Sequence, residues 1–161
     1  MSIKILFLLV VVAVCSGIGW KISNRISSRR KYFEDLILLL NTLISDMRFS
    51  QTNLSRLLVR ACPTKGKLKV SVDEFLLYVD GKTNELTLSK LDLTDREYEF
   101  VKEMFSTLGR YDLDSQVYVL TEFKRKAEEF YSACKEEENK KGKASKKLGI
   151  MAGRAIGLIF L

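Results

Sequence analysis

Apolar residues recur at spacings of three and four along the middle of the chain, which is the period of an α-helix. The longest such run covers residues 30–49, where Leu38, Leu39 and Leu43 widen the apolar face. The positions that set its period are Phe33, Leu36, Ile37, Leu40, Ile44 and Met47. This pattern predicts a largely buried helix over residues 30–49.

Three shorter helices are predicted to follow. Leu54, Leu57, Leu58 and Ala61 indicate a helix that ends before Pro63 and Gly66. Two capping boxes then open further helices, one at Ser71-x-x-Glu74 and one at Thr94-x-x-Glu97, because a hydroxyl and a carboxylate three positions apart satisfy the free amides of a first turn. We expect the first of these to end near Gly81 and the second at Gly109 in a left-handed cap.

Residues 86–93 alternate between apolar and polar side chains, so a short strand is a second interpretation of that segment. After Gly109, Asp112 is placed to cap a long helix over residues 113–139. Its expected apolar stripe is Leu113, Val117, Leu120, Phe123, Ala127, Phe130 and Cys134. The fold class predicted for the middle of the chain is an all-α bundle.

The first part of the chain is apolar and free of charge over the 16 residues 5–20, which is about 24 Å of helix at ~1.5 Å per residue. We therefore predict a transmembrane anchor at residues 3–22, with Lys4 and Lys21 reaching toward the headgroups. A cleaved secretory signal is the competing interpretation. Many basic residues follow the segment and few precede it, which favours an uncleaved anchor with the rest of the chain in the cytoplasm.

The last part of the chain, residues 148–161, is also apolar but is short and contains Arg154. We expect a C-terminal membrane segment here that either spans the bilayer or lies flat in the interface. The length of the segment leaves both alternatives open.

The charge of +7 over 161 residues is unevenly distributed. Two basic collars, residues 23–31 and 140–147, are predicted to flank the membrane segments, and residues 32–139 between them carry a net charge of −5. The membrane-flanking basic residues are Lys21, Arg25, Arg29, Arg30, Lys31, Lys140, Lys141, Lys143, Lys146 and Lys147. An acidic cytoplasmic bundle between collars argues against nucleic-acid binding, since that function needs basic residues on the folded domain itself.

Little in the sequence points to catalysis. The chain has no His, which excludes catalytic triads and His-ligated metals. The cysteines, Cys15, Cys62 and Cys134, are widely spaced and are interpreted as small buried residues. The acidic pairs Asp112/Asp114 and Asp92/Asp95 lie at predicted helix starts, where carboxylates complement the helix dipole. The tyrosines that could stack on bases are interpreted as rim-of-core residues: Tyr98, Tyr111, Tyr118 and Tyr131. We expect no catalytic residue, no metal, no cofactor and no small-molecule substrate.

One constellation is more specific. Residues 105–109 read Phe-Ser-Thr-Leu-Gly, and Asp112 and Gln116 follow before a long charged helix and an apolar tail containing Gly149 and Gly153. Together with the N-terminal anchor, the basic collar and the helix over residues 30–49, this pattern resembles the stage III sporulation protein AB family. The element from Thr107 to Gln116 is the most specific part of the resemblance.

The resemblance implies a non-catalytic membrane component of the complex that joins mother cell and forespore, located in the mother-cell membrane around the forespore. It also implies a cytoplasmic domain similar to the helical domain of the type II secretion F-protein. The cytoplasmic domain of this chain would then dock a secretion-type ATPase encoded in the same operon. Other stage III sporulation membrane proteins and membrane lipid are the further partners implied.

Carried over by position, the candidate partner-binding residues are Thr107, Leu108, Gly109, Tyr111, Asp112 and Gln116. Any helix–turn–helix corner needs a glycine, a cap and an apolar contact, so a purely structural role for these residues is the alternative. Two rival functions stay open at this point. They are a generic membrane-tethered helical adaptor outside sporulation and a small membrane-bound enzyme.

Overall fold

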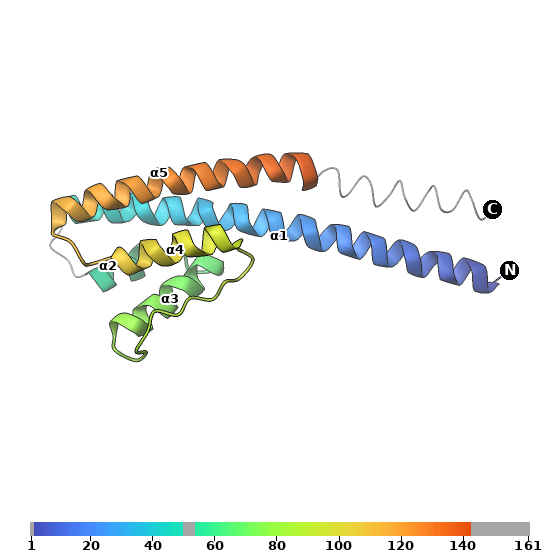
Figure 1. Cartoon of the computed structure of the whole chain (residues 1–161), viewed down its shortest axis with the longest axis horizontal. Helices are drawn as coiled ribbons and strands as arrows, with labels where there is room; N and C mark the ends of the chain where they lie inside the picture. The colour runs from blue at the N-terminus through green and yellow to red at the C-terminus, as the bar shows by residue number, and fades with distance from the viewer. Residues whose placement is uncertain (1, 50–53, 143–161) are drawn as a thin grey trace. The chain divides into compact units, whose positions relative to one another are not determined.

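The structure is a computed structural model and describes residues 2–49 and 54–142. Its regular elements in this part of the chain are all helical (Figure 1). They are α1 (Ser2–Phe49), α2 (Leu54–Ala61), α3 (Lys67–Val79), α4 (Asp95–Thr107), α5 (Leu113–Glu137) and a π-helical turn, η1 (Glu138–Gly142). The predicted all-α class is confirmed for the described residues.

The chain divides into two compact units, which are described separately. Unit 1 comprises Met1–Ser28 and Ala133–Leu161. Within it, Ile26 and Cys134 are buried, while Trp20 and Ile22 are exposed. No helix in the described part of the chain is both long and apolar enough to cross a membrane. The predicted membrane segment at residues 148–161 lies outside the described residues.

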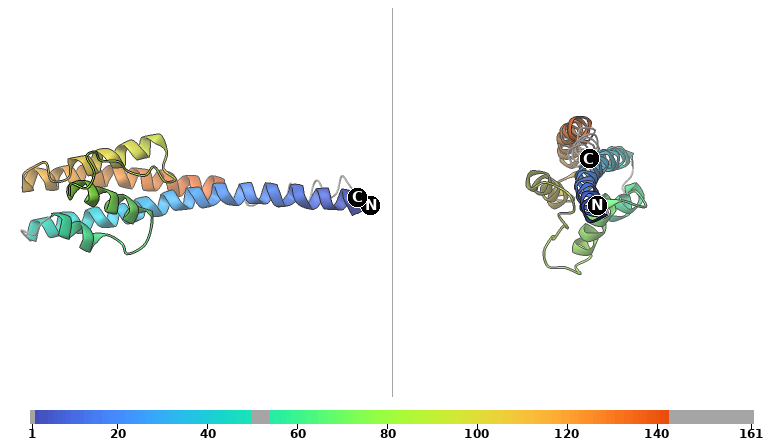
Figure 2. Two further views of the ribbon diagram at one scale, coloured as in Figure 1. Left: turned by 90° about the horizontal axis from the view of Figure 1, so that it is seen from below. Right: turned by 90° about the vertical axis from the view of Figure 1, so that its right-hand side faces the viewer.

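Unit 2, Arg29–Ser132, is a helical bundle with one apolar core. Its centre is a cluster of phenylalanines in which Phe33 of α1 stacks on Phe130 of α5 with ring centroids 5.2 Å apart. Phe100 of α4 contacts Phe130 and Phe123, and Phe105 contacts Phe75 of α3. Figures 1 and 2 agree in showing α4 beside α3 and beside α5. Aromatic pairs of this kind each contribute about 0.5–1.5 kcal/mol beyond the area that they bury.

The apolar face of residues 30–49 is buried as the helical period predicts. Leu36, Leu39, Leu40 and Leu43 have no exposed surface, whereas Leu38 is 65% exposed. The helix itself begins earlier than residue 30, because α1 is continuous from Ser2. The short predicted helix is confirmed as α2, which buries Leu57 and Leu58.

The capping box predicted at Ser71 is wrong. Helix α3 begins at Lys67 after Gly66, and Ser71 lies inside it with 1% of its surface exposed. The Ser71 hydroxyl accepts a hydrogen bond from the Tyr32 hydroxyl of α1 at 3.0 Å. Burial raises the pKa of Tyr32, so this phenol stays protonated and serves as a donor.

The alternative of a strand over residues 86–93 is also wrong. Backbone groups in this segment bond to side chains instead of to a neighbouring strand. The Ser89 N–H donates to the Glu74 carboxylate at 2.8 Å, and the Tyr98 hydroxyl donates to the Leu88 carbonyl at 3.1 Å. Leu88 and Leu93 are buried, so the alternation reflects an extended loop that packs on the bundle.

The second capping box is confirmed. The Glu97 N–H donates to the Thr94 hydroxyl at 3.4 Å, and the Thr94 N–H donates to the Glu97 carboxylate at 2.8 Å. Helix α4 therefore begins where the sequence predicts, and it ends at Thr107, just before Gly109.

Candidate functional site

The corner between α4 and α5 holds the six candidate partner-binding residues. Leu108 is the C-cap of α4, with its N–H donating to the Phe105 carbonyl at 3.2 Å, and its side chain is buried. The Thr107 hydroxyl donates to the Met104 carbonyl at 2.8 Å. Gly109 follows with φ of 77°, a left-handed conformation that favours glycine. A Cβ at this position would lie 3.2 Å from Leu54 of α2, so the turn also packs closely against its neighbour.

Asp112 caps α5 as the sequence predicts. Its carboxylate accepts a hydrogen bond from the Ser115 N–H at 3.2 Å, and its carbonyl accepts the Gln116 N–H at 2.8 Å. The hydrogen bonds from Ser115 lower the pKa of the Asp112 carboxyl, so the cap is ionised at neutral pH. An ionised cap at the N-terminus of α5 is favoured by the helix dipole.

Gln116 closes the corner from the inside. Its side chain is only 3% exposed, and its Oε1 accepts the Gly109 N–H at 3.0 Å. The buried Nε2 makes no hydrogen bond to any described residue. Because the amide joins the first turn of α5 to the turn after α4, it fixes the angle at which the two helices meet. The bond thus reaches the glycine just beyond α4 and not α4 itself.

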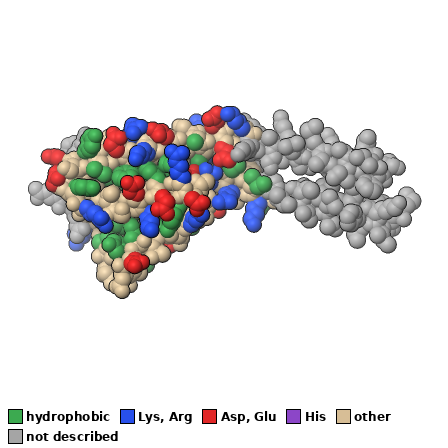
Figure 3. All heavy atoms as spheres, viewed as in Figure 1, with side chains coloured by type: hydrophobic (Ala, Val, Ile, Leu, Met, Phe, Trp, Pro, Cys, Tyr) green, Lys and Arg blue, Asp and Glu red, His purple; other side chains and the backbone are tan. Residues whose placement is uncertain are grey.

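The structure thus gives five of the six candidates a structural role, and Tyr111 is the one that exposes an apolar surface. Tyr111 is 50% exposed. Two further apolar side chains nearby on α5 are exposed, Leu113 at 54% and Tyr118 at 69%. Figure 3 shows hydrophobic side chains at the surface near the start of α5.

Leu113 and Tyr118 were not among the sequence candidates. Leu113 continues the apolar stripe of α5 at the correct spacing, so the sequence placed it in the core, and Tyr118 was interpreted as a rim-of-core residue. Both interpretations are wrong, because Leu113 and Tyr118 lie on the exposed side of α5 while Gln116 and Leu120 of the same helix are buried. A signal was present in the sequence, since these three large apolar residues occur within nine positions of Gly109.

The predicted membrane-flanking residues differ in their surroundings. Lys21, Arg25 and Lys31 are exposed on α1. Arg30 pairs with Glu34 at 3.0 Å, and Lys140 pairs with Glu136 at 2.5 Å. Arg29 differs from all of these, because its side chain is 14% exposed and bonds to Glu97 inside unit 2. The side chain of Lys141 is not described, and the remaining three lie outside the described residues: Lys143, Lys146 and Lys147.

Asp92 and Asp95, two of the acidic residues at predicted helix starts, form ion pairs. Asp92 pairs with Lys67, and Asp95 pairs with Lys90. Within residues 2–49 and 54–142, no three Cys, Asp or Glu side chains are grouped so that they could hold a metal ion. Cys134 is buried and Cys62 is half-buried, and burial raises the pKa of the Cys62 thiol, which keeps it protonated.

The described geometry is therefore that of an all-helical protein with a fixed, apolar corner. A family model described as stage III sporulation protein AB matches residues 4–161. The chain belongs to the stage III sporulation protein AB family and has a role in stage III sporulation. This is a family of sporulation structural proteins and not a known enzyme family. No curated protein and no solved structure matched the chain.

Proposed function

We propose that the chain is a non-catalytic membrane platform of the secretion-like channel complex between mother cell and forespore. In this role it docks the cytoplasmic secretion-type ATPase encoded in the same operon. The observation that carries the proposal is the exposure of Tyr111, Leu113 and Tyr118 at a corner whose backbone is fixed by hydrogen bonds. Family membership favours this function over a generic adaptor outside sporulation.

The corner has the properties of a protein-binding surface. Tyrosine is enriched among the residues that dominate binding energies, because its ring buries a large area at a small loss of side-chain entropy. The Gln116–Gly109 and Asp112–Ser115 bonds hold the turn in one conformation before any partner arrives. A preorganised surface loses less entropy on binding than a mobile one. Docking at this corner therefore needs little rearrangement.

Membrane attachment is the second part of the proposal. In this proposal residues 3–22 serve as the anchor, although no helix in the described residues is long and apolar enough to span a membrane. Trp20 and Ile22 at the end of this segment are 68% and 48% exposed, which suits side chains that meet lipid headgroups. The exposed cations Lys21, Arg25 and Lys31 follow on the same helix and attract anionic lipid. This arrangement favours a cytoplasmic location for unit 2, where an ATPase can reach it.

A photo-reactive amino acid in place of Tyr111 tests the proposal in sporulating cells. We expect a covalent adduct with the ATPase of the operon, together with digestion of unit 2 by protease added from the cytoplasmic side. The same amino acid at Lys102, an exposed residue of α4, is the matched control and is expected to give little adduct. A unit 2 protected from cytoplasmic protease, or equal adducts at both positions, would contradict the platform function.

A further inference from the structure

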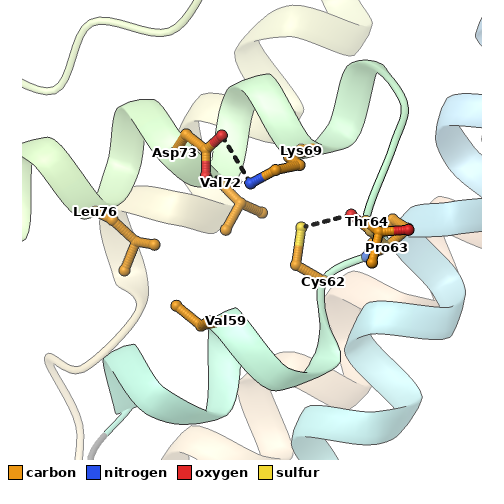
Figure 4. Close-up of a pocket in the computed structure, with 8 residues that line it drawn as sticks. All are labelled: Val59, Cys62, Pro63, Thr64, Lys69, Val72, Asp73 and Leu76. Atoms are coloured by element: carbon orange, nitrogen blue, oxygen red, sulfur yellow. Dashed lines mark hydrogen bonds and ion pairs between the residues drawn. The ribbon is translucent and has the colours of Figure 1, made fainter.

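Two surfaces of unit 2 expose apolar side chains, and their charges differ. The hollow between α2 and α3 has both signs of charge at its edge, because Lys69 and Asp73 line it and pair at 2.9 Å (Figure 4). It therefore favours neither an acidic nor a basic partner. The corner between α4 and α5 has one sign. Residues 111–122, which include its exposed apolar side chains, contain three acidic residues and no Lys or Arg, and the nearest bases in the sequence are Arg110 and Lys124.

Tyr118 lies between two carboxylates on the outer side of α5. Asp114 is four positions before it and Glu122 is four positions after it. Side chains four positions apart lie on the same face of a helix, with Cβ atoms about 5–6 Å apart. This face is open to solvent, since Tyr118 is 69% exposed and Asp114 is exposed, while Gln116 and Leu120 are buried. We call Asp114, Tyr118 and Glu122 the Tyr118 stripe.

The carboxylates of the Tyr118 stripe outnumber the cations of this chain that pair with them. Asp114 forms no ion pair with another described residue. Glu122 lies 3.3 Å from Arg125, but Arg125 also pairs with Glu129 at 2.6 Å. Two carboxylates thus share one guanidinium. The stripe keeps an excess of negative charge around an exposed aromatic ring.

We propose that the Tyr118 stripe receives a basic side chain of the docked protein, and that this side chain is an arginine. A guanidinium is attracted to the face of a tyrosine ring, and its planar N–H groups donate to carboxylates on either side. Anionic lipid and nucleic acid are disfavoured as occupants, because their phosphates would be repelled by Asp114 and Glu122. The inference rests on the proposed function, which places a protein at this corner, and adds the chemistry of the surface that the partner presents.

A photo-reactive amino acid at Thr121 tests the inference. Thr121 is exposed and lies three positions after Tyr118 and seven after Asp114, on the same side of α5. The full chain carries the probe in sporulating cells, and mass spectrometry identifies the crosslinked peptide. We expect a peptide of the operon's ATPase that contains Arg. In Asp114→Lys the adduct should fall about tenfold, since like charges across an interface are unfavourable. It should recover when that Arg of the partner is changed to Glu.

Glu99→Lys is the matched control for the change of charge. Glu99 is an exposed carboxylate that forms no ion pair with a described residue, and it lies on α4 eight positions, or about 12 Å of helix, before Thr107. Glu99→Lys is expected to keep the adduct. Asp114→Asn, which keeps the shape of the side chain, should lower the adduct less than Asp114→Lys. Circular dichroism verifies that each variant remains helical.

Several results would overturn the inference. They are an adduct that Asp114→Lys lowers no more than Glu99→Lys does, a crosslinked peptide without Arg or Lys, an adduct with lipid or with a second copy of this chain, and no adduct. The Tyr111 adduct is measured in the same cells. If Tyr111 captures the ATPase while the Thr121 adduct is insensitive to Asp114→Lys, the platform function stands and the basic partner surface is refuted. A charge-sensitive Thr121 adduct with a basic peptide of another protein supports the stripe and contradicts docking of the ATPase.

Discussion

Arg29 and Glu97, which are 68 positions apart in the sequence, form a buried ion pair. Arg29 Nη2 lies 2.7 Å from Glu97 Oε1, and Arg29 Nε donates to both carboxylate oxygens at 3.0 and 3.2 Å. The same carboxylate completes the capping box of α4 through the Thr94 N–H. One side chain therefore joins α1, at the start of unit 2, to the first turn of α4.

Removing the charge of Glu97 is expected to destabilise the bundle. In Glu97→Gln the Arg29 guanidinium loses its counter-charge while the pair's surroundings remain buried, and losing one partner of a buried pair costs about 3–5 kcal/mol. Because Arg29 is 14% exposed and an amide oxygen remains as an acceptor, we expect a loss of about 2–3 kcal/mol. Urea unfolding of the full chain in detergent, monitored by circular dichroism, measures this loss of unfolding free energy. Glu99→Gln, at an exposed neighbouring position, is the control, and equal losses in the two variants would contradict the assignment.

The same pair makes stability depend on pH. Burial alone would raise the pKa of Glu97, but hydrogen bonds from Arg29 and Thr94 outweigh it and hold the pKa below its ordinary value of 4.5. The unfolded chain therefore binds this proton more readily than the folded chain. The advantage of the wild type over Glu97→Gln should be complete above about pH 5.5 and should shrink as the pH falls through the folded pKa. An advantage that stayed constant or grew in acid would show that the charge of Glu97 is not involved.

Gly109→Ala tests the geometry of the corner. The substitution places a Cβ in a left-handed backbone, which costs about 1–2 kcal/mol, and brings it to 3.2 Å from Leu54. Gly81→Ala is a matched control, because Gly81 has φ of 71° and no atom within 4 Å of the new Cβ. Gly109→Ala should therefore lose more stability in urea unfolding than Gly81→Ala. In a Leu54→Ala background, the extra loss of stability caused by Gly109→Ala relative to Gly81→Ala should become smaller. Equal losses of stability in Gly109→Ala and Gly81→Ala would show that Gly109 makes no close contact with Leu54.

Gln116 is predicted to stabilise the corner in two ways, through its oxygen and through the space that its buried side chain fills. Gln116→Ala removes the acceptor for the Gly109 N–H and leaves a cavity, with an expected loss of about 1–3 kcal/mol. Both substitutions remove the acceptor and the unbonded Nε2, but Gln116→Met fills the space. The Met variant should therefore unfold at a higher urea concentration than the Ala variant, with the exposed Thr121→Ala as control. A Met variant no better than Ala would mean that filling this space does not stabilise the corner.

The two predicted capping boxes show what the sequence could and could not establish. Both have a hydroxyl and a Glu three positions apart, yet only Thr94–Glu97 caps a helix. Ser71 bonds instead to Tyr32, which is 39 positions away. Capping depends on neighbours in the sequence, whereas the Tyr32 contact depends on how α1 and α3 pack. Local patterns therefore predicted the helices, the Gly109 turn and the Asp112 cap, while they missed this contact.

The same distinction applies to the candidate site. The period of α5 places Leu113 on the apolar stripe, but whether that stripe is covered depends on where the other helices end. Arg29 lies among cations that follow a predicted membrane segment, and its distant partner Glu97 is not apparent from that context. The location of the site was predictable from its glycine and its cap. Its exposed residues became identifiable only from the packed bundle.

Binding of the operon's purified ATPase to the full chain in lipid nanodiscs tests the central claim most directly. We compare the wild type, the double variant Leu113→Ser/Tyr118→Ala and the control Leu38→Ser, which changes a 65% exposed apolar residue of α1. The account predicts that the wild type and the control bind with the same Kd, and that the corner variant binds about tenfold more weakly, since interface tyrosines dominate binding energies. Equal binding by all three proteins, or no binding by the wild type, would contradict it.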